Sequence, residues 1–175
     1  MDFTPYLLTA DPGSNNEEGL LSVEIPARIA VAMKGRFLLR AVCQSFGEHN
    51  TITCAVTDQE SCLAYLASDP APTYDLLICT DYLESGNGFE LVRQAKLIHP
   101  QLHCVVLALG DVIPAEYAEA SWLEAVVAEA DFVEDQQPLK AAVLAVISGH
   151  SYRSPSLRTG LLPYLSCPQI GRAHV

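Results

Sequence analysis

Residues 74–91, which read YDLLICTDYLESGNGFEL, decide the fold class of this 175-residue chain. The first part is a short continuous apolar run, typical of a buried strand, and the second part is a glycine turn followed by a helical pattern. Asp81 lies between them, at the carboxyl end of the predicted strand. In open parallel sheets, ligands and chemistry are found just beyond the carboxyl ends of strands. This position predicts that Asp81 binds or reacts rather than packs.

Strand-like and helix-like patterns alternate on both sides of this stretch. We predict strands at residues 28–33, 51–56, 75–80, 103–108 and 131–133, and helices at residues 36–46, 57–66, 88–99, 114–128 and 138–148. This alternation indicates an α/β domain in which a five-stranded parallel sheet carries helices on both faces. The expected strand order is flavodoxin-like, with the switch point beside the third strand.

Composition and charge exclude several classes of protein. The formal net charge of -11 argues against nucleic-acid binding by this segment itself. The apolar runs are too short to span a bilayer and the N-terminus has no signal-peptide pattern, so we expect a cytoplasmic protein. None of the six cysteines forms a C-x-x-C pair, and Cys54, Cys79 and Cys104 fall inside strand-like runs. We therefore expect buried, reduced thiols rather than metal ligands.

The chain divides into three parts. Residues 1–26 contain an acidic stretch rich in helix-breaking residues and are expected to form a flexible leader. Residues 27–152 are the predicted domain, and residues 153–175 are a linker or tail. Residues 170–175 can be encoded by a sequencing adapter, so we expect an artefactual end to a truncated reading frame. A natural single domain with a short tail is the alternative.

Two segments resemble a known family. The residues around Asp81 are similar to the third strand and following loop of a response-regulator receiver domain. Residues 148–155, which read SGHSYRSP, resemble the segment that ends the receiver in LuxR/FixJ (NarL)-type regulators. The resemblance covers residues 28–155 and implies a CheY-like fold, with Asp81 as the phosphoacceptor of a two-component phosphorelay. It also implies that a helix-turn-helix DNA-binding domain, absent from this chain, follows the receiver.

Residues that surround the phosphoacceptor in typical receivers are replaced in this sequence. Two acids at the end of the first strand normally help to hold Mg²⁺, which prefers hard oxygen ligands. Ala32, Met33 and Lys34 occupy that place. A Ser or Thr at the end of the fourth strand normally donates a hydrogen bond to the phosphoryl group, and here Ala108 or Leu109 stands there. The resemblance therefore implies a receiver that is degenerate at its phosphorylation site.

The lysine that normally ends the fifth strand and pairs with phosphate is replaced as well, by Glu134 and Asp135. A lone Asp81 is a poor phosphoryl acceptor, because catalysis of phosphoryl transfer consists mainly of positioning and charge neutralisation. We expect no catalytic residue, no metal ligand and no cofactor, with Mg²⁺ binding weak or absent. A loop acid without chemistry is the alternative interpretation of Asp81.

Several other side chains are candidates for roles near Asp81. Lys34 is a candidate charge partner, because its ammonium would stabilise the carboxylate, and a side chain that points to solvent is the alternative. Glu84 and Asp111 are loop acids that either rebuild a weak cation site or lie as solvated surface charges. Phe132 matches an aromatic position that reports switching in many receivers, and core packing is its preferred interpretation.

Two functions fit this resemblance. The first is a two-component-type response regulator with an atypical receiver, which controls transcription through the absent LuxR-type domain. The alternative is a stand-alone pseudo-receiver that acts as a protein-interaction adaptor. The expected partners are a histidine kinase or another signalling protein and a second copy of the chain. The protein is expected to bind DNA only through the absent domain and is not expected to bind a membrane.

The sequence also indicates a contact surface and argues against an enzyme. By the resemblance, the contact surface lies around Tyr117, Trp122 and Leu139, with ordinary packing of these side chains as the alternative. The first strand is followed by no glycine-rich phosphate loop, and the sequence contains neither G-x-S-x-G nor paired-histidine metal spacing. We therefore predict that the protein is not an enzyme.

Overall fold

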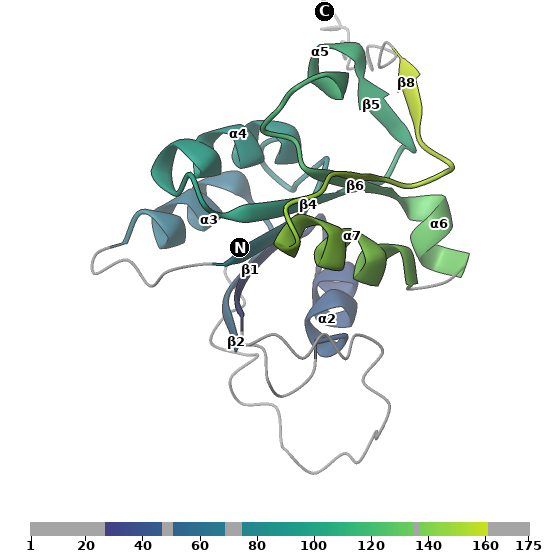
Figure 1. Ribbon diagram of the computed structural model, residues 1–175. Helices are drawn as coiled ribbons and strands as arrows, with labels where there is room; N and C mark the ends of the chain where they lie inside the picture. Colours follow the sequence, from purple (N-terminus) through teal and green to yellow (C-terminus); the bar gives the residue numbers. More distant parts are fainter. Residues whose placement is uncertain (1–26, 47–50, 69–74, 135–136, 161–175) are drawn as a thin grey trace, which may run out of the picture.

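Six parallel strands form the main sheet of the computed structural model, which describes residues 27–46, 51–68, 75–134 and 137–160. The strands are β1 (Arg28–Ala32), β2 (Thr51–Val56), β3 (Leu76–Thr80), β4 (His103–Ala108), β6 (Ala125–Ala128) and β7 (Tyr152–Arg153). Their order is β2-β1-β3-β4-β6-β7. Figure 1 labels β1, β2, β4 and β6 of this sheet. This order confirms the flavodoxin-like prediction, since the direction of progression reverses at β1. The two-residue strand β7 was not predicted.

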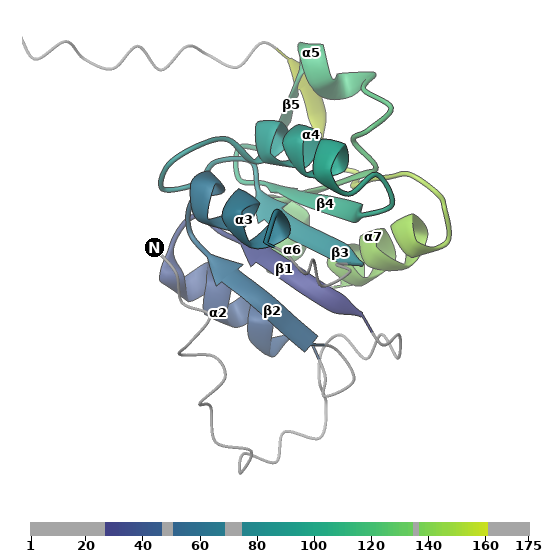
Figure 2. The ribbon, with the colours of Figure 1, turned by 90° about the vertical axis from the view of Figure 1, so that its left-hand side faces the viewer.

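Helices cover both faces of the sheet (Figure 2). The longer ones are α2 (Arg36–Gln44), α3 (Gln59–Leu66), α4 (Gly88–Ile98) and α7 (Gln137–Ile147). Helices α3 and α4 pack on one face, and α2 and α7 pack on the other. Along β3, Leu77 and Cys79 join the first of these two cores, whereas Leu76 and Ile78 join the second. Burial on both faces explains why β3 reads as a continuous apolar run.

The fifth strand of the domain lies where we predicted a helix. Instead of a helix over residues 114–128, the chain forms the short strand β5 (Val112–Pro114), one helical turn, α5 (Ala115–Ala118), and then β6. Every residue of β6 is buried. The helix prediction was wrong because the alanines and glutamates around β6 favour a helix locally, whereas packing between β4 and α7 selects the strand.

The short strand predicted at residues 131–133 is also wrong. These residues belong to the helix α6 (Glu129–Glu134), whose first turn is acidic. A strand inside a sheet that is covered on both faces buries its side chains, and acids without partners are costly to bury. The acidic segment therefore forms a helix that follows the carboxyl end of β6 instead of a strand within the sheet.

Residues 152–160 follow α7, pass along β6 and end in the strand β8, Arg158–Gly160 (Figure 1). Strand β7 pairs with β6, and β8 pairs in parallel with β5 to form a separate two-stranded sheet. The predicted leader, residues 1–26, and the end of the predicted tail, residues 161–175, lie outside the described residues.

The described cysteines are buried and carry free thiols, which confirms their interpretation as core residues. They are Cys43, Cys54, Cys62, Cys79 and Cys104. Burial raises the pKa of Cys43 and of Cys104 to about 12, so both thiols stay protonated at neutral pH. Within the described ranges, no helix combines the length and apolar character that crossing a bilayer requires.

Candidate functional site

Asp81 directly follows β3, and its carboxylate faces the turn after β4. The residue is 2% exposed. Its Oδ1 atom accepts hydrogen bonds from the backbone N–H groups of Tyr82 and Leu109, each at 3.0 Å. Burial raises the pKa of this carboxyl above its usual range, although the surrounding backbone N–H groups act in the opposite direction. Asp81 is thus a buried acid held by the main chain at the carboxyl edge of the sheet.

We expect Asp81→Asn to stabilise the protein at neutral pH and to have little effect at strongly acidic pH. Because burial raises the pKa of Asp81, its contribution to wild-type stability is fully present below the unfolded-state pKa of about 3.9. That contribution is lost as the pH rises through the folded-state pKa. The asparagine keeps an oxygen that accepts from Tyr82 and Leu109, but it cannot ionise. Urea unfolding of the wild type and of Asp81→Asn, from strongly acidic to neutral pH, measures the difference in stability. A variant that is less stable than the wild type at neutral pH would contradict this prediction.

A buried hydroxyl joins the ends of β1 and β3 beside Asp81. Thr80 Oγ1 accepts a hydrogen bond from the amide of Lys34 at 2.8 Å and donates one to Tyr82 O at 2.5 Å. The ammonium of Lys34 lies 5.8 Å from the centre of the Tyr82 ring, within cation–π range. No ion pair joins Lys34 and Asp81 within the described ranges. Lys34 is therefore anchored next to Asp81 by its backbone, and its role as a charge partner stays a prediction.

The loop after Asp81 returns closely to the end of β3. Gly86 has a positive φ of 106°, which favours glycine. Asn87 caps α4 by accepting from the amides of Phe89 and Glu90. The amide of Gly88 then donates to Asp81 O at 2.8 Å. The glycine turn predicted from the sequence thus brings the start of α4 against the backbone of Asp81.

The two loop acids considered as cation ligands are engaged by other groups. Glu84 Oε2 accepts a hydrogen bond from Thr57 Oγ1 at 2.7 Å. Asp111 Oδ1 accepts from the amide of Ala130 at 3.3 Å. The described part of the chain contains no group of three or more His, Cys, Asp or Glu side chains suited to a metal ion. The residues present therefore do not fit an Mg²⁺ site of the type implied by the resemblance.

The ends of β1, β4 and β6 carry apolar or acidic residues. Ala32, the last residue of β1, and the following Met33 are both fully buried. Ala108, the last residue of β4, is fully buried too. Because the fifth strand is β6, its end is marked by Ala128 and Glu129 rather than by the Glu134 and Asp135 that we aligned there. The acid that stands where typical receivers have a lysine is therefore Glu129. Of the two residues that we expected there, only Glu134 is within the described residues.

Two further assignments that depended on the fifth strand change with it. Phe132 lies on α6 and not on a strand, and it packs against the core formed with α2 and α7, in agreement with its core interpretation. Leu139 is fully buried in that same core, whereas Tyr117 and Trp122 pack against the core on the opposite face. These three side chains therefore do not share one contact surface. Tyr117 instead stacks on Phe89, with ring centroids 5.0 Å apart, and contacts the edge of Trp122.

Sequence reasoning missed the groups that hold Asp81. The amides of Tyr82 and Leu109 are backbone donors, which every residue except proline carries, so no sequence pattern singles them out. Thr80 did carry a signal, since a hydroxyl at the end of an otherwise apolar strand needs a hydrogen-bond partner when buried. Arg153 and Ser154, described below, lie in the predicted linker, and the sequence analysis used them for the family resemblance but assigned them no contact.

Comparisons with known proteins agree with this architecture. No protein-family model matches the chain, and no curated protein matches it in sequence. Among solved structures, the isolated REC domain of RcsB from Salmonella enterica serovar Typhimurium, studied with the phosphomimetic BeF3-, has a TM-score of 0.60 at 18% identity. That match covers 76% of this chain and 96% of the REC domain. The fold is that of a response-regulator receiver domain. A structure of two RcsB dimers bound to two parallel DNAs matches 76% of this chain with a TM-score of 0.63 at 19% identity.

The match covers part of a DNA-bound RcsB chain and nearly all of an isolated receiver domain. This chain covers 66% of the RcsB chain in the complex with two parallel DNAs, just under two thirds of its length. The non-phosphorylated receiver domain of RcsB from Escherichia coli is covered to 99%, with a TM-score of 0.53 at 15% identity. Within the receiver fold, the fourth connecting helix is here the single turn α5.

Proposed function

We propose that this chain is the atypical receiver of a two-component-type response regulator, which controls transcription through a LuxR-type DNA-binding domain outside this chain. The observation that carries the proposal is the position of Asp81, a buried carboxylate at the carboxyl end of β3 in a receiver fold. Neighbouring structures of RcsB, described as a response regulator bound to DNA, support the output that we propose. The proposed location is the cytoplasm, and the proposed partners are a histidine kinase or another signalling protein and a second copy of the chain.

We further propose that this receiver is degenerate at its phosphorylation site. Ala32 and Met33 offer no oxygen ligand at the end of β1, and Ala108 offers no hydroxyl at the end of β4. Glu129 at the end of β6 adds a negative charge where a phosphoryl group needs a cation. Because phosphoryl transfer depends on positioning and charge neutralisation, acyl phosphate formation on Asp81 is expected to be slow, and Mg²⁺ binding weak or absent.

We expect acetyl phosphate and Mg²⁺ to leave the intact mass of this chain unchanged. The reason is that the donors to the Asp81 carboxylate are backbone amides, and the acid pair, the hydroxyl and the lysine that neutralise a phosphoryl group in typical receivers are replaced. The measurement is mass spectrometry of the wild-type chain and of Asp81→Asn after the same incubation. A stable gain of one phosphoryl group in the wild type that is absent from Asp81→Asn would overturn the proposed degeneracy. That outcome would restore a conventional phosphorylation switch.

A stand-alone pseudo-receiver that acts as an adaptor is the second candidate function. The same replacements around Asp81 favour it, since a domain that does not depend on phosphorylation can act through protein contacts alone. The gene beyond this segment separates the two candidates. An in-frame helix-turn-helix favours the transcription regulator, and a stop codon with no such domain favours the adaptor.

A further inference from the structure

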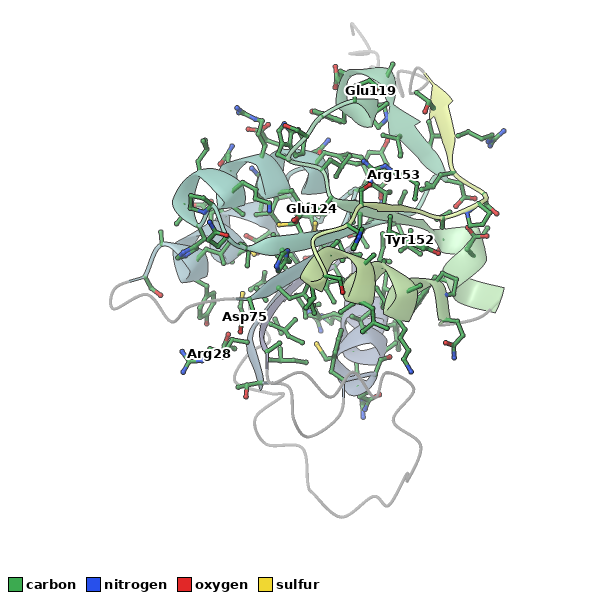
Figure 3. The ribbon with its side chains drawn as sticks, viewed as in Figure 1. Arg28, Asp75, Glu119, Glu124, Tyr152 and Arg153 are labelled. Carbon is green, nitrogen blue, oxygen red and sulfur yellow. The ribbon has the colours of Figure 1, made fainter. Side chains whose placement is uncertain are left out.

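The segment after α7 closes the edge of β6. The amide of Tyr152 donates to Glu124 O at 2.9 Å, and the amide of Ser154 donates to Val126 O at 3.1 Å. Ser154 Oγ in turn accepts from the amide of Ala128 at 2.7 Å. Figure 3 shows Tyr152 and Arg153 where this segment passes β6 and Glu124. An edge strand that would otherwise offer free backbone groups is therefore paired within the chain.

A tight turn redirects this segment toward the loop after β4. The amide of Leu157 donates to Ser154 O at 3.2 Å, and Pro155 occupies the second position of the turn, which its fixed φ favours. Ser156 donates from its amide and its hydroxyl to the two carboxylate oxygens of Asp131 on α6, at 3.1 and 2.6 Å. The turn is thus tied to the helix that follows β6.

After the turn, the chain attaches to the loop that holds Asp81. The amide of Arg158 donates to Asp111 O at 2.9 Å, and β8 then pairs with β5. Asp111 has a positive φ of 52°, and its carboxylate accepts from Ala130 on α6. Leu109, whose amide donates to Asp81, lies only two residues before Asp111. Two hydrogen bonds, one at each end of the loop at residues 109–111, therefore connect Asp81 and Arg158 through the backbone of this loop.

We propose that residues 152–160 form a strap that couples the carboxylate of Asp81 to β8 through the loop at residues 109–111. Release of the strap frees the loop at residues 109–111, and a change at Asp81 that weakens its bond to Leu109 loosens the strap in return. The two effects are reciprocal by thermodynamic linkage, since one coupling free energy, carried by the loop at residues 109–111, connects them. The biological use of this coupling rests on the proposed function, but its physical test requires no phosphorylation and no DNA.

The strap is tested with Arg158→Pro and its matched control Arg158→Ala in the full chain. Proline removes the amide that donates to Asp111, whereas alanine keeps it. Amide hydrogen exchange is followed at Leu109 and Ala130, with Ile78 in the centre of β3 as the reference for global stability. We expect exchange at Leu109 and Ala130 to rise about tenfold in the proline variant only, with Ile78 unchanged relative to the control. Equal exchange at Leu109 in both variants would overturn the proposal.

The reverse direction provides a second measurement if Arg158→Pro does not fold. Asp81→Ala removes the oxygen that accepts from Leu109, whereas Asp81→Asn keeps one. We expect exchange of the Arg158 amide to rise several-fold in Asp81→Ala and to stay close to wild type in Asp81→Asn. An Arg158 amide that exchanges at the same rate in both variants would show that the strap is a passive cover. Failure here leaves the proposed function standing, because the acetyl phosphate experiment has its own readout.

Discussion

Gly88→Ala is expected to lower the free energy of unfolding by at least about 3 kcal/mol. A Cβ atom at this position would overlap Thr80 O and lie 2.8 Å from Thr80 C and 3.1 Å from Asp81 Cα. These atoms belong to the backbone at the end of β3, so no flexible side chain can move aside to accept the methyl group. Urea or guanidinium unfolding of the purified variant measures the loss.

Gly110→Ala is the matched control for this substitution. Gly110 is a loop residue near Asp81, and nothing lies within 4 Å of a Cβ atom at this position. We expect its free energy of unfolding to stay within about 0.5 kcal/mol of wild type. If Gly88→Ala unfolded at the same denaturant concentration as Gly110→Ala, the close approach of α4 to the end of β3 would be wrong.

The second large effect is expected from Arg153→Met, which should lower the free energy of unfolding by about 3 kcal/mol. The guanidinium donates to Glu124 O at 3.0 Å, to Tyr152 O at 2.9 Å and to Leu123 O at 2.7 Å. These bonds tie β7 to the residues that lead into β6. Burial lowers the pKa of Arg153 from its usual range, so the cation is partly removed from water and depends on these carbonyl groups. Methionine keeps much of the apolar stem but donates no hydrogen bond.

Two further variants serve as comparisons for Arg153→Met. Arg158→Met changes an exposed arginine of the same segment and is expected to alter stability by no more than about 0.5 kcal/mol. Arg153→Lys keeps the charge but lacks the planar fork that reaches two carbonyl groups at once, so an intermediate loss is expected. Thermal unfolding of the three variants and the wild type ranks their stabilities. Equal stability of Arg153→Met and Arg158→Met would contradict a structural role for the half-buried Arg153.

The stretch at residues 74–91 was sufficient to predict the strand, the turn and the helix between which Asp81 lies. Its apolar run is unbroken because β3 is buried on both faces, and a continuous run is what a parallel sheet covered on two sides requires. Gly86 and Gly88 mark the turn because one has a positive φ and the other leaves no space for a Cβ atom. The apolar run and the glycine turn are set by residues close to one another in the sequence, so they could be predicted from the local pattern.

The fifth strand was beyond local reasoning. Ala125-Val126-Val127-Ala128 lies among alanines and glutamates, and a window of this composition favours a helix. Only pairing with β4 on one side and β7 on the other makes it a strand. The error moved the expected lysine position to Glu134 and Asp135 and placed Phe132 on a strand, because each assignment was counted from the wrong element.

Sequence alone determined the fold class, the core thiols and the placement of Asp81 at a carboxyl edge, since these follow from periodicity and from the end of one apolar run. Tertiary structure alone decided what surrounds Asp81: the amides of Tyr82 and Leu109, and the attachment of residues 152–160 to the loop at Asp111. The physical reason is that these contacts use backbone donors and acceptors, which nearly every residue carries. Their pairing is therefore set by which strands and loops the folded chain brings together.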